Sequence, residues 1–208
     1  MNIISDSEIN NYKNGIVLTQ EIKTNTFILI GELNNDVLMN NLIKDVKDVK
    51  DKIDNKKNLL NYKTNVKAIH TGFKSLTHNS NVHKFFCETQ SSIFKIYKKN
   101  FEIKDVWGNI YSKPNEDYAQ EHNHSDCTAF CGIIYLTDSP GPGTYFREYD
   151  LLVPEKKGRF VFFHPFLFHE VPLYNYTQER ITIAFNLFGL KPWDNCDHAY
   201  KINKKIEL

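Results

Sequence analysis

Hydrophobic residues in the first half of the chain recur with the period of a helix. Between Asn34 and Lys57, apolar residues stand three or four positions apart, and lysines and aspartates fill most positions between them. A second stretch, residues 79–99, repeats the pattern with larger apolar side chains. Each stretch predicts an amphipathic helix with one buried stripe and a solvated face. The predicted buried positions are Leu38, Leu42, Val46, Val49 and Ile53 in the first helix and Val82, Phe85, Phe86, Ile93, Phe94 and Tyr97 in the second.

Shorter hydrophobic runs, typical of β-strands, dominate the second half of the chain. Residues 26–30 form one such run before the helices, and five more follow Trp107, separated by turn sequences rich in proline, glycine and charge. The later runs cover residues 131–137, 144–149, 159–164, 168–173 and 180–188. Many short strands with such turns are typical of a double-sheet jelly roll, and preceding helices are expected to cover one sheet face. We therefore predict an α+β fold, a double-stranded β-helix (jelly roll) of mainly antiparallel strands backed by N-terminal helices.

The whole chain is predicted to be one domain. With 208 residues, of which 41% are hydrophobic, it is large enough for one well-buried core and small for two. We divide residues 1–208 into a scaffold of helices and strands (1–106), a jelly-roll core (107–190) and a polar tail (191–208).

Composition excludes several classes of partner. The net charge is +1, from 26 basic and 25 acidic residues, so no overall field favours nucleic acid or an anionic membrane. No apolar run approaches the roughly 20 residues that span a bilayer. The first residues lack the basic end and apolar block of a secretion signal, and the four cysteines follow no disulfide-framework spacing. We therefore expect a cytoplasmic protein with no nucleic-acid or membrane partner.

Two histidines and an aspartate predict a metal site. His124 and Asp126 are two positions apart, so in an extended strand both point to one side and can bind one ion. His169 would reach the same ion from a later strand. Two imidazoles and one carboxylate suit iron(II) and leave coordination positions open for other ligands.

The ligand set has alternatives. His122, His124 and Asp126 are each two positions apart, so a His122/His124 pair competes with the His124/Asp126 pair. His164 competes with His169, although Pro165 follows it directly. A zinc site at Cys127 and Cys131 is disfavoured because the chain has no Cys-x-x-Cys pair.

The last predicted strand carries a candidate anion site. Residues 180–188 alternate strictly, so Arg180 and Thr182 lie on the face opposite Ile181 and Ile183. An arginine on an inward face requires a partner, because a buried unpaired charge is costly. A carboxylate ligand held bidentately would satisfy it. A structural salt bridge to Glu148 or Glu170 is the alternative.

Several motifs in this half resemble one enzyme family. The matching segments are Gly132–Thr137, Gly143-Thr144-Tyr145-Phe146, Lys157–Phe163, Phe168–Val171, Arg180-Ile181-Thr182 and Ala184-Phe185-Asn186. Together with the His-x-Asp and distal histidine, their order resembles the iron(II)- and 2-oxoglutarate-dependent dioxygenases. The resemblance covers about residues 107–188 and is closest to small single-domain, prolyl-hydroxylase-like oxygenases of phages and bacteria.

The resemblance implies cofactors, a reaction and partners. Iron(II) would be held by His124, Asp126 and His169, and 2-oxoglutarate by Arg180 and Thr182. A tyrosine is expected to assist the carboxylate, with Tyr135 preferred over Tyr111 and Tyr118. Such enzymes use molecular oxygen to convert 2-oxoglutarate to succinate and CO2 while they hydroxylate a small-molecule or peptide substrate. A non-catalytic jelly-roll binding module is the alternative, and loops at residues 62–78 and 105–120 are expected to shape the entrance.

Overall fold

The structure is a computed structural model, and it describes most of the chain. The described residues are 2–3, 16–19, 28–55, 64–97, 101–124, 130–139, 141–175 and 177–189. The predicted polar tail and Asp126 lie outside these ranges.

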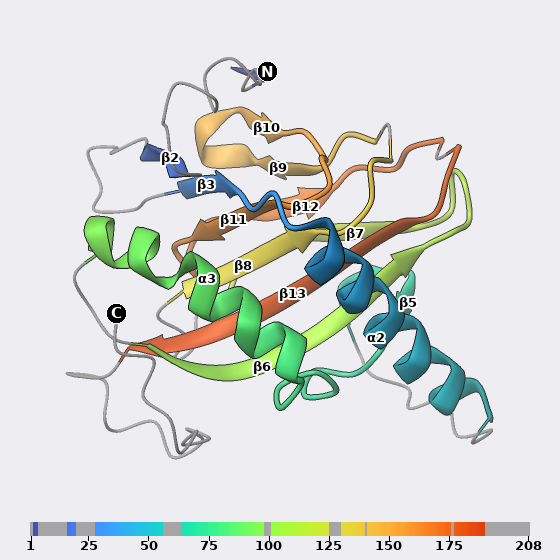
Figure 1. Ribbon diagram of the computed structural model, residues 1–208. Helices are drawn as coiled ribbons and strands as arrows, with labels where there is room; N and C mark the ends of the chain where they lie inside the picture. The colour runs from blue at the N-terminus through green and yellow to red at the C-terminus, as the bar shows by residue number, and fades with distance from the viewer. Residues whose placement is uncertain are drawn as a thin grey trace.

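Two β-sheets lie face to face in the described part of the chain (Figure 1). The larger has the strand order β2 (Ile16–Thr19), β3 (Ile28–Glu32), β11 (Arg159–Phe163), β8 (Phe130–Tyr135), β13 (Arg180–Gly189), β6 (Phe101–Tyr111) and β5 (Ile69–His70). The smaller has the order β1 (Asn2–Ile3), β10 (Leu151–Val153), β9 (Thr144–Phe146), β12 (His169–Val171), β7 (Tyr118–His122) and β4 (Val66–Lys67). Every pairing is antiparallel except that of β1 with β10, so the described strands are mainly antiparallel, as predicted.

Two helices cover the outer face of the larger sheet (Figure 1). They are α2 (Asp36–Asn55) and α3 (Ser80–Tyr97), close to the predicted bounds. Each begins after an asparagine that accepts backbone hydrogen bonds, Asn35 from Leu38 and Asn79 from Val82, both at 3.0 Å. The predicted apolar stripe of α2 is buried against the sheet at Leu38, Leu42 and Val46. None of the described helices has the length and apolarity to cross a membrane.

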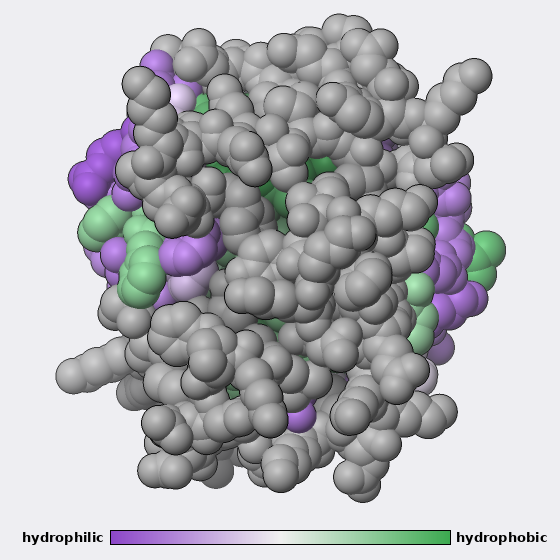
Figure 2. All heavy atoms as spheres, turned by 90° about the vertical axis from the view of Figure 1, so that its left-hand side faces the viewer, coloured by the Kyte–Doolittle hydropathy of each residue, from purple (hydrophilic) through white to green (hydrophobic). Residues whose placement is uncertain are grey.

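A second core fills the space between the sheets. The residues that form it come from β3, β8 and β11 on one side and from β9 and β10 on the other: Ile28, Ile30, Cys131, Ile133, Tyr135, Val161, Phe163, Phe146, Leu151 and Val153. The described side chains visible at the flanks of the face shown in Figure 2 are mainly hydrophilic. The helices therefore stabilise one face of the larger sheet and leave its inner face to the smaller sheet.

Several elements differ from the sequence-based expectation. β6 spans residues 101–111, so the expected entrance loop at 105–120 is largely wrong and the predicted boundary at residue 106 falls within a strand. The predicted strand at 144–149 ends at Phe146 and continues as a 3-10 turn, η1 (Arg147–Tyr149). β10 follows as a separate strand that the sequence did not reveal. β6 was missed because its inward face carries Asp105 and Asn109, which interrupt the apolar alternation.

Gly108 allows α2 to pack closely on β6. A Cβ at this position would lie 2.6 Å from Cγ1 of Val46. We expect Gly108→Ala to lower the free energy of unfolding by about 1–3 kcal/mol, the usual cost of overpacking a core. Urea unfolding of Gly108→Ala, Val46→Ala and the double variant checks this. The double variant should be more stable than the sum of the single effects predicts, and strict additivity would contradict the assignment.

Candidate metal centre and co-substrate cleft

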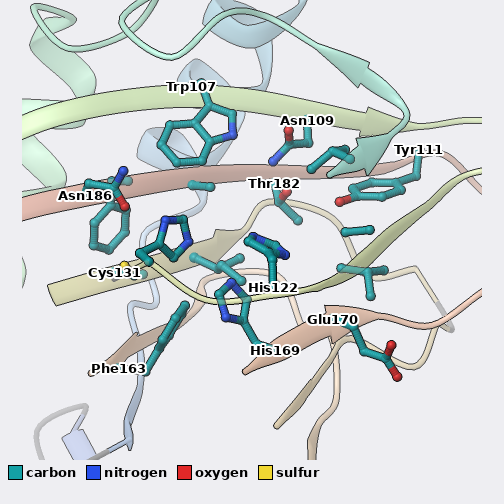
Figure 3. A pocket seen from close by; sticks show the side chains of 18 of the residues that line it. Trp107, Asn109, Tyr111, His122, Cys131, Phe163, His169, Glu170, Thr182 and Asn186 are labelled. Atoms are coloured by element: carbon teal, nitrogen blue, oxygen red, sulfur yellow. The ribbon is translucent and has the colours of Figure 1, made fainter. Parts of the chain in front are cut away.

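A cleft opens between the two sheets, with an empty volume of about 480 Å³ that includes its solvent-open part. Its floor is the inner face of β13, β6 and β8, and its opposite wall comes from β7 and β12. Figure 3 shows Tyr111 and Glu170 at one end, Trp107, Asn186 and Cys131 at the other, and His122 between them.

The floor is organised in rows across three strands. Residues that face each other in the register are Arg180 and Tyr111, then Tyr135, Thr182 and Asn109, then Ile133, Ala184 and Trp107, and last Cys131, Asn186 and Asp105. Because side chains two positions apart share a face, the polar residues of β13 form one line along the cleft. The predicted alternation of residues 180–188 is therefore confirmed, and Arg180 and Thr182 both line the cleft.

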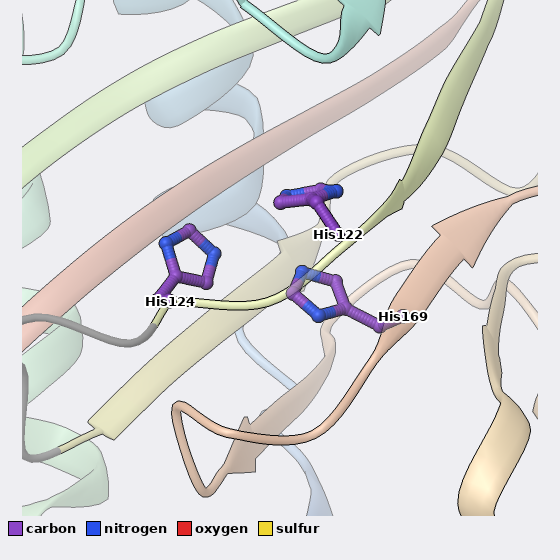
Figure 4. Close-up of side chains that lie close together, drawn as sticks. All are labelled: His122, His124 and His169. Atoms are coloured by element: carbon purple, nitrogen blue, oxygen red, sulfur yellow. The ribbon is translucent and has the colours of Figure 1, made fainter.

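Three histidines meet on the wall above this floor (Figure 4). His122 ends β7 and is paired in register with His169 of β12. His124 lies just beyond β7, where its backbone N–H donates to the Pro165 carbonyl at 2.7 Å. The candidate ligand atoms of the three residues all lie within 4.8 Å of one another. Two nitrogens that share an ion at about 2.1 Å each lie at most about 4.2 Å apart, so small ring rotations suffice to bind one ion.

Backbone carbonyls fix the tautomers of two of these rings. His122 Nδ1 lies 2.7 Å from the Gln120 carbonyl, and His169 Nδ1 lies 3.0 Å from the Leu167 carbonyl. A carbonyl oxygen only accepts, so each Nδ1 must carry the proton and donate it. Each Nε2 then keeps its lone pair, which is the arrangement found for histidines that bind metals.

Burial favours the neutral form of two of these rings, His169 and His122. Burial lowers the pKa of His169 well below its usual value, and the neighbouring His122 and His124 lower it further. Burial also lowers the pKa of His122, against the opposing hydrogen bond to Gln120. Neutral imidazoles are the form that binds a metal ion, so the cluster is suited to one near neutral pH.

The structure brings together His124 and His169, as predicted, and adds His122, the open alternative. Asp126 lies outside the described residues, so its role as a ligand stays a prediction. His164 lies outside the cluster, with its ring 5.1 Å from that of Phe166. The sequence signal for His122 was its period-two spacing with His124, and its pairing with His169 needed the structure.

Arg180 is buried at the Tyr111 end of the cleft. Its side chain is 1% exposed, and its Nε donates to Oε2 of Glu155 at 2.7 Å. The guanidinium carbon lies 4.4 Å from the ring centroid of Tyr111 and 5.6 Å from that of Tyr135. The guanidinium group therefore contacts a carboxyl group through Nε and lies beside two aromatic rings.

The salt bridge differs from the predicted alternatives. Glu148 and Glu170 were the candidate partners of Arg180 in the salt-bridge alternative, but Glu155 forms that salt bridge, from the turn between β10 and β11. Glu148 accepts instead from the backbone N–H of Phe168 at 3.0 Å. Sequence reasoning missed Glu155 because a glutamate in a charged turn usually faces solvent.

Glu155 is a buried carboxyl group with a perturbed titration. Burial raises its pKa to about 7, although the charge of Arg180 and the hydrogen bonds from Thr137 and Arg180 oppose the rise. The Thr137 hydroxyl donates to Oε1 at 3.0 Å and accepts the backbone N–H of Ile181 at 3.0 Å. Glu155 is thus fixed to the strand that carries Arg180.

Tyr135, the preferred tyrosine, does not line the cleft. It is fully buried, and its hydroxyl donates to Oγ1 of Thr144 at 2.7 Å. Burial raises its pKa to about 12, so it stays a neutral phenol. Tyr111 does line the cleft beside Arg180, while Tyr118 lies under the ammonium of Lys67. The contact of Tyr135 with a co-substrate stays a prediction, and Tyr111 has the better position for it.

Three uncharged side chains in the cleft lining each have a buried polar atom with no hydrogen-bond partner among the described residues. The atoms are Nε1 of Trp107, Oδ1 of Asn109 and Oδ1 of Asn186. The three side chains are 4–8% exposed. Leaving such groups unpaired costs about 1–3 kcal/mol each, so the cleft is suited to a polar ligand or water that pairs with them.

Comparisons with known proteins establish the fold. No protein-family model and no curated protein matches the chain. Among solved structures, it is similar to SnoK, a non-heme alpha-ketoglutarate-dependent carbocyclase from nogalamycin biosynthesis (12% identity, 88% of this chain and 83% of that chain, TM-score 0.57). It is also similar to a Pseudomonas putida prolyl-4-hydroxylase (13% identity, 74% and 87%, TM-score 0.53). A third is a viral collagen prolyl hydroxylase from Paramecium bursaria Chlorella virus-1 (18% identity, 76% and 94%, TM-score 0.50).

These likenesses confirm the predicted jelly roll. The structures that share the fold are an alpha-ketoglutarate-dependent carbocyclase and two prolyl hydroxylases, and the sequence motifs resemble those of 2-oxoglutarate-dependent oxygenases.

Proposed function

We propose that this chain is an iron(II)- and 2-oxoglutarate-dependent oxygenase that hydroxylates a small molecule or a protein side chain. The observation that carries the proposal is the convergence of three imidazoles and a buried arginine on one cleft. Its products besides the oxidised substrate would be succinate and CO2, and molecular oxygen would be consumed.

The residues present fit iron(II). His124 and His169 lie together in the structure, and the third ligand is His122 or Asp126. The position of His122 supports it as a ligand, because its nitrogen lies with those of the other two rings and its tautomer is fixed. A three-histidine set is neutral, so it leaves the full positive charge of the ion to the other ligands. Anionic chelation by a 2-oxo acid is therefore favoured.

The residues also fit 2-oxoglutarate. Arg180 lies at the end of the line of polar side chains on β13, and Thr182 follows it toward the histidines. Arg180 would hold the distal carboxylate through its terminal nitrogens, since Glu155 binds its Nε. Thr182 would donate its hydroxyl, and Tyr111 or the predicted Tyr135 would assist.

Iron and 2-oxoglutarate, when bound, would supply the oxidising chemistry. The chain's own tasks are to orient and to exclude water. Arg180 would fix one end of the co-substrate, and the histidines would hold the ion that binds its other end. Apolar side chains of Ile133, Phe163 and Phe185 line the space around them and keep it dry.

Succinate formation from 2-oxoglutarate, aerobic and with added iron(II), tests the proposal. We expect slow turnover without a prime substrate, which needs both iron(II) and oxygen. Arg180→Lys should require more 2-oxoglutarate for the same rate, because a lysine cannot make the bidentate contact.

The alternative is a jelly-roll binding module without turnover. It predicts that neither iron(II) nor 2-oxoglutarate binds in an anaerobic calorimetric titration. Binding of both ligands without succinate formation would instead indicate an enzyme that needs its prime substrate.

A further inference from the structure

A β-bulge in β7 turns His122 into the cleft. Ala119 and His122 both line the cleft, although they are three positions apart and would face opposite sides of a regular strand. Their partners on β12 are Val171 and His169, which are only two positions apart. β7 therefore carries one extra residue between these two pairs, and such a bulge changes the direction of the side chain that follows it. His122 depends on this irregularity for its place beside His169.

Gln120 and Glu121 form the bulge, and both lie outside the cleft lining. The backbone N–H of Gln120 donates to the Asn65 carbonyl at 2.8 Å, and the Gln120 carbonyl accepts from Nδ1 of His122 at 2.7 Å. The direction of the His122 ring therefore depends on the conformation of the bulge.

Arg147 connects this bulge to the strand that carries His169. Its Nη1 donates to Oε2 of Glu121 at 2.7 Å, and Glu121 directly precedes His122. Its guanidinium carbon lies 4.7 Å from the ring centroid of Phe168, and its backbone N–H donates to the Phe168 carbonyl at 3.3 Å. Phe168 directly precedes His169. One residue thus contacts the chain neighbour of each of two candidate ligands.

The turn that carries Arg147 is itself attached to β12. This turn, η1, follows β9, and Phe146 at the end of β9 is paired with His169 in register. The carboxylate of Glu148, the next residue of η1, accepts the backbone N–H of Phe168 at 3.0 Å. The Arg147 side chain therefore extends from a backbone that is fixed relative to His169.

Arg147 also balances two carboxylates of like charge. Glu121 and Glu170 lie opposite each other at the bulge, on β7 and β12. Burial and the charge of Glu121 raise the pKa of Glu170, whereas the charge of Arg147 lowers it. Figure 3 shows the Glu170 carboxylate turned away from the histidines. Without Arg147, two like charges would face each other across neighbouring strands, which is destabilising.

Arg147 and Glu121 lie outside the cleft. Neither is among the described residues that line it, and their side chains are 55% and 32% exposed. An exposed ion pair contributes little to the stability of a fold. A change in metal binding after removal of Arg147 would therefore report the placement of the histidines, and not a loss of folding.

We propose that Arg147 is a positioning residue of the candidate metal centre, and that it holds the β7 bulge against β12 so that the rings of His122 and His169 meet. The proposal rests on the proposed function for the metal, whereas the orientation of the rings can be tested without one. These two rings have centroids 4.3 Å apart, and each lies more than 5 Å from the ring of His124. Arg147 thus acts on the closest pair of rings in the cluster.

The first test uses the metal-free protein and the variant Arg147→Gln, which removes the cation. Long-range proton–nitrogen NMR distinguishes the two tautomers of a neutral imidazole, and His122→Gln identifies the signals of His122. We expect His122 to carry its proton on Nδ1 in the wild-type protein. In Arg147→Gln we expect a mixture of both tautomers, because the Gln120 carbonyl is no longer held in place.

The second test is a calorimetric titration with zinc(II) alone, a redox-inert substitute for iron(II). Arg147→Gln should weaken zinc binding roughly tenfold, the lower end of the effect of losing a partner outside the ligand shell. Its unfolding midpoint in urea should stay close to that of the wild-type protein. Lys84→Gln is the matched control, because the Lys84–Glu88 ion pair has side chains 56% and 29% exposed and lies on α3, far from the bulge in sequence. It should change neither tautomer nor zinc affinity.

A double-mutant cycle shows whether Arg147 acts through Glu121. Glu121→Gln should weaken zinc binding about as much as Arg147→Gln, and the double variant no more than either, since the two residues share one contact. The proposal is overturned if Arg147→Gln keeps the wild-type tautomer and zinc affinity, if Lys84→Gln weakens binding equally, or if the two effects add. A wild-type protein that binds no zinc would refute the metal centre and the proposed function, and the tautomer comparison would then decide alone whether Arg147 orients His122.

Discussion

Replacement of His122 by alanine is expected to lower the affinity for iron(II) more than about 100-fold, because loss of a partner outside the ligand shell alone costs 10–100-fold. The two remaining rings would supply only two of the three protein ligands. His169 and His124 would remain, and both lie within reach of the same ion. Succinate formation should fall with the bound metal.

The companion variant, Asp126→Ala, separates the two ligand sets. If the three imidazoles hold the ion, this variant should keep metal affinity close to that of the wild-type protein. If Asp126 replaces His122 in the ligand shell, the order of the two effects reverses. An anaerobic calorimetric titration with iron(II) at pH 7.5 measures both.

His164→Ala is the control for the loss of one imidazole. His164 is half-buried and lies outside the histidine cluster, so its removal should change neither affinity nor turnover. Equal weakening by His164→Ala and His122→Ala would show that the cluster is not the metal site.

The fold was predictable where the chain follows one simple period. The buried stripe of Leu38, Leu42 and Val46 predicted α2, and the alternation from Arg180 predicted β13 and its polar face. β6 was not predicted because a residue of the candidate site interrupts its apolar alternation: Asn109 is polar and faces inward toward the cleft. Local pattern rules read such residues as loop.

Contacts between residues far apart in the chain could not be predicted from the sequence. The spacing of His122, His124 and Asp126 allowed two ligand pairs, and only the register of β7 with β12 places His122 opposite His169. Glu155 is 25 residues from Arg180 and lies in a turn, where nothing local indicates burial. The residue types indicated the chemistry of the site. Which residues contact each other depends on how the strands pair, and the sequence did not show that pairing.

Arg180→Leu is expected to lower the free energy of unfolding by about 3–5 kcal/mol, because it leaves the buried carboxyl of Glu155 without its cation. The side chains of both residues are at most 1% exposed, so water cannot replace the lost partner. Arg180→Leu combined with Glu155→Leu should recover much of the loss. Urea unfolding of the three variants checks this, and equal destabilisation of single and double variants would contradict it.

The pH dependence of stability has a definite sign. The pKa of Glu155 is raised from 4.5 to about 7 by burial, so the folded protein holds this proton more tightly than the unfolded chain. The stabilisation is complete below pH 4.5 and is lost as pH rises to about 7. Glu155→Gln should therefore gain stability relative to the wild-type protein over that window. His169, whose pKa is lowered, contributes the opposite slope in both proteins and cancels in the comparison.

The same group links co-substrate binding to protons. With Glu155 ionised, Arg180 is already neutralised, and a second carboxylate at its terminal nitrogens meets repulsion. With Glu155 protonated, the full charge of Arg180 faces the co-substrate. Affinity for 2-oxoglutarate should therefore fall as pH rises through about 7 in the wild-type protein and stay flatter in Glu155→Gln. The titration is made at saturating metal, because protonation of the histidines acts in the opposite direction. If the two proteins show the same slope, Glu155 does not exchange its proton when Arg180 binds a carboxylate, and the salt bridge is purely structural.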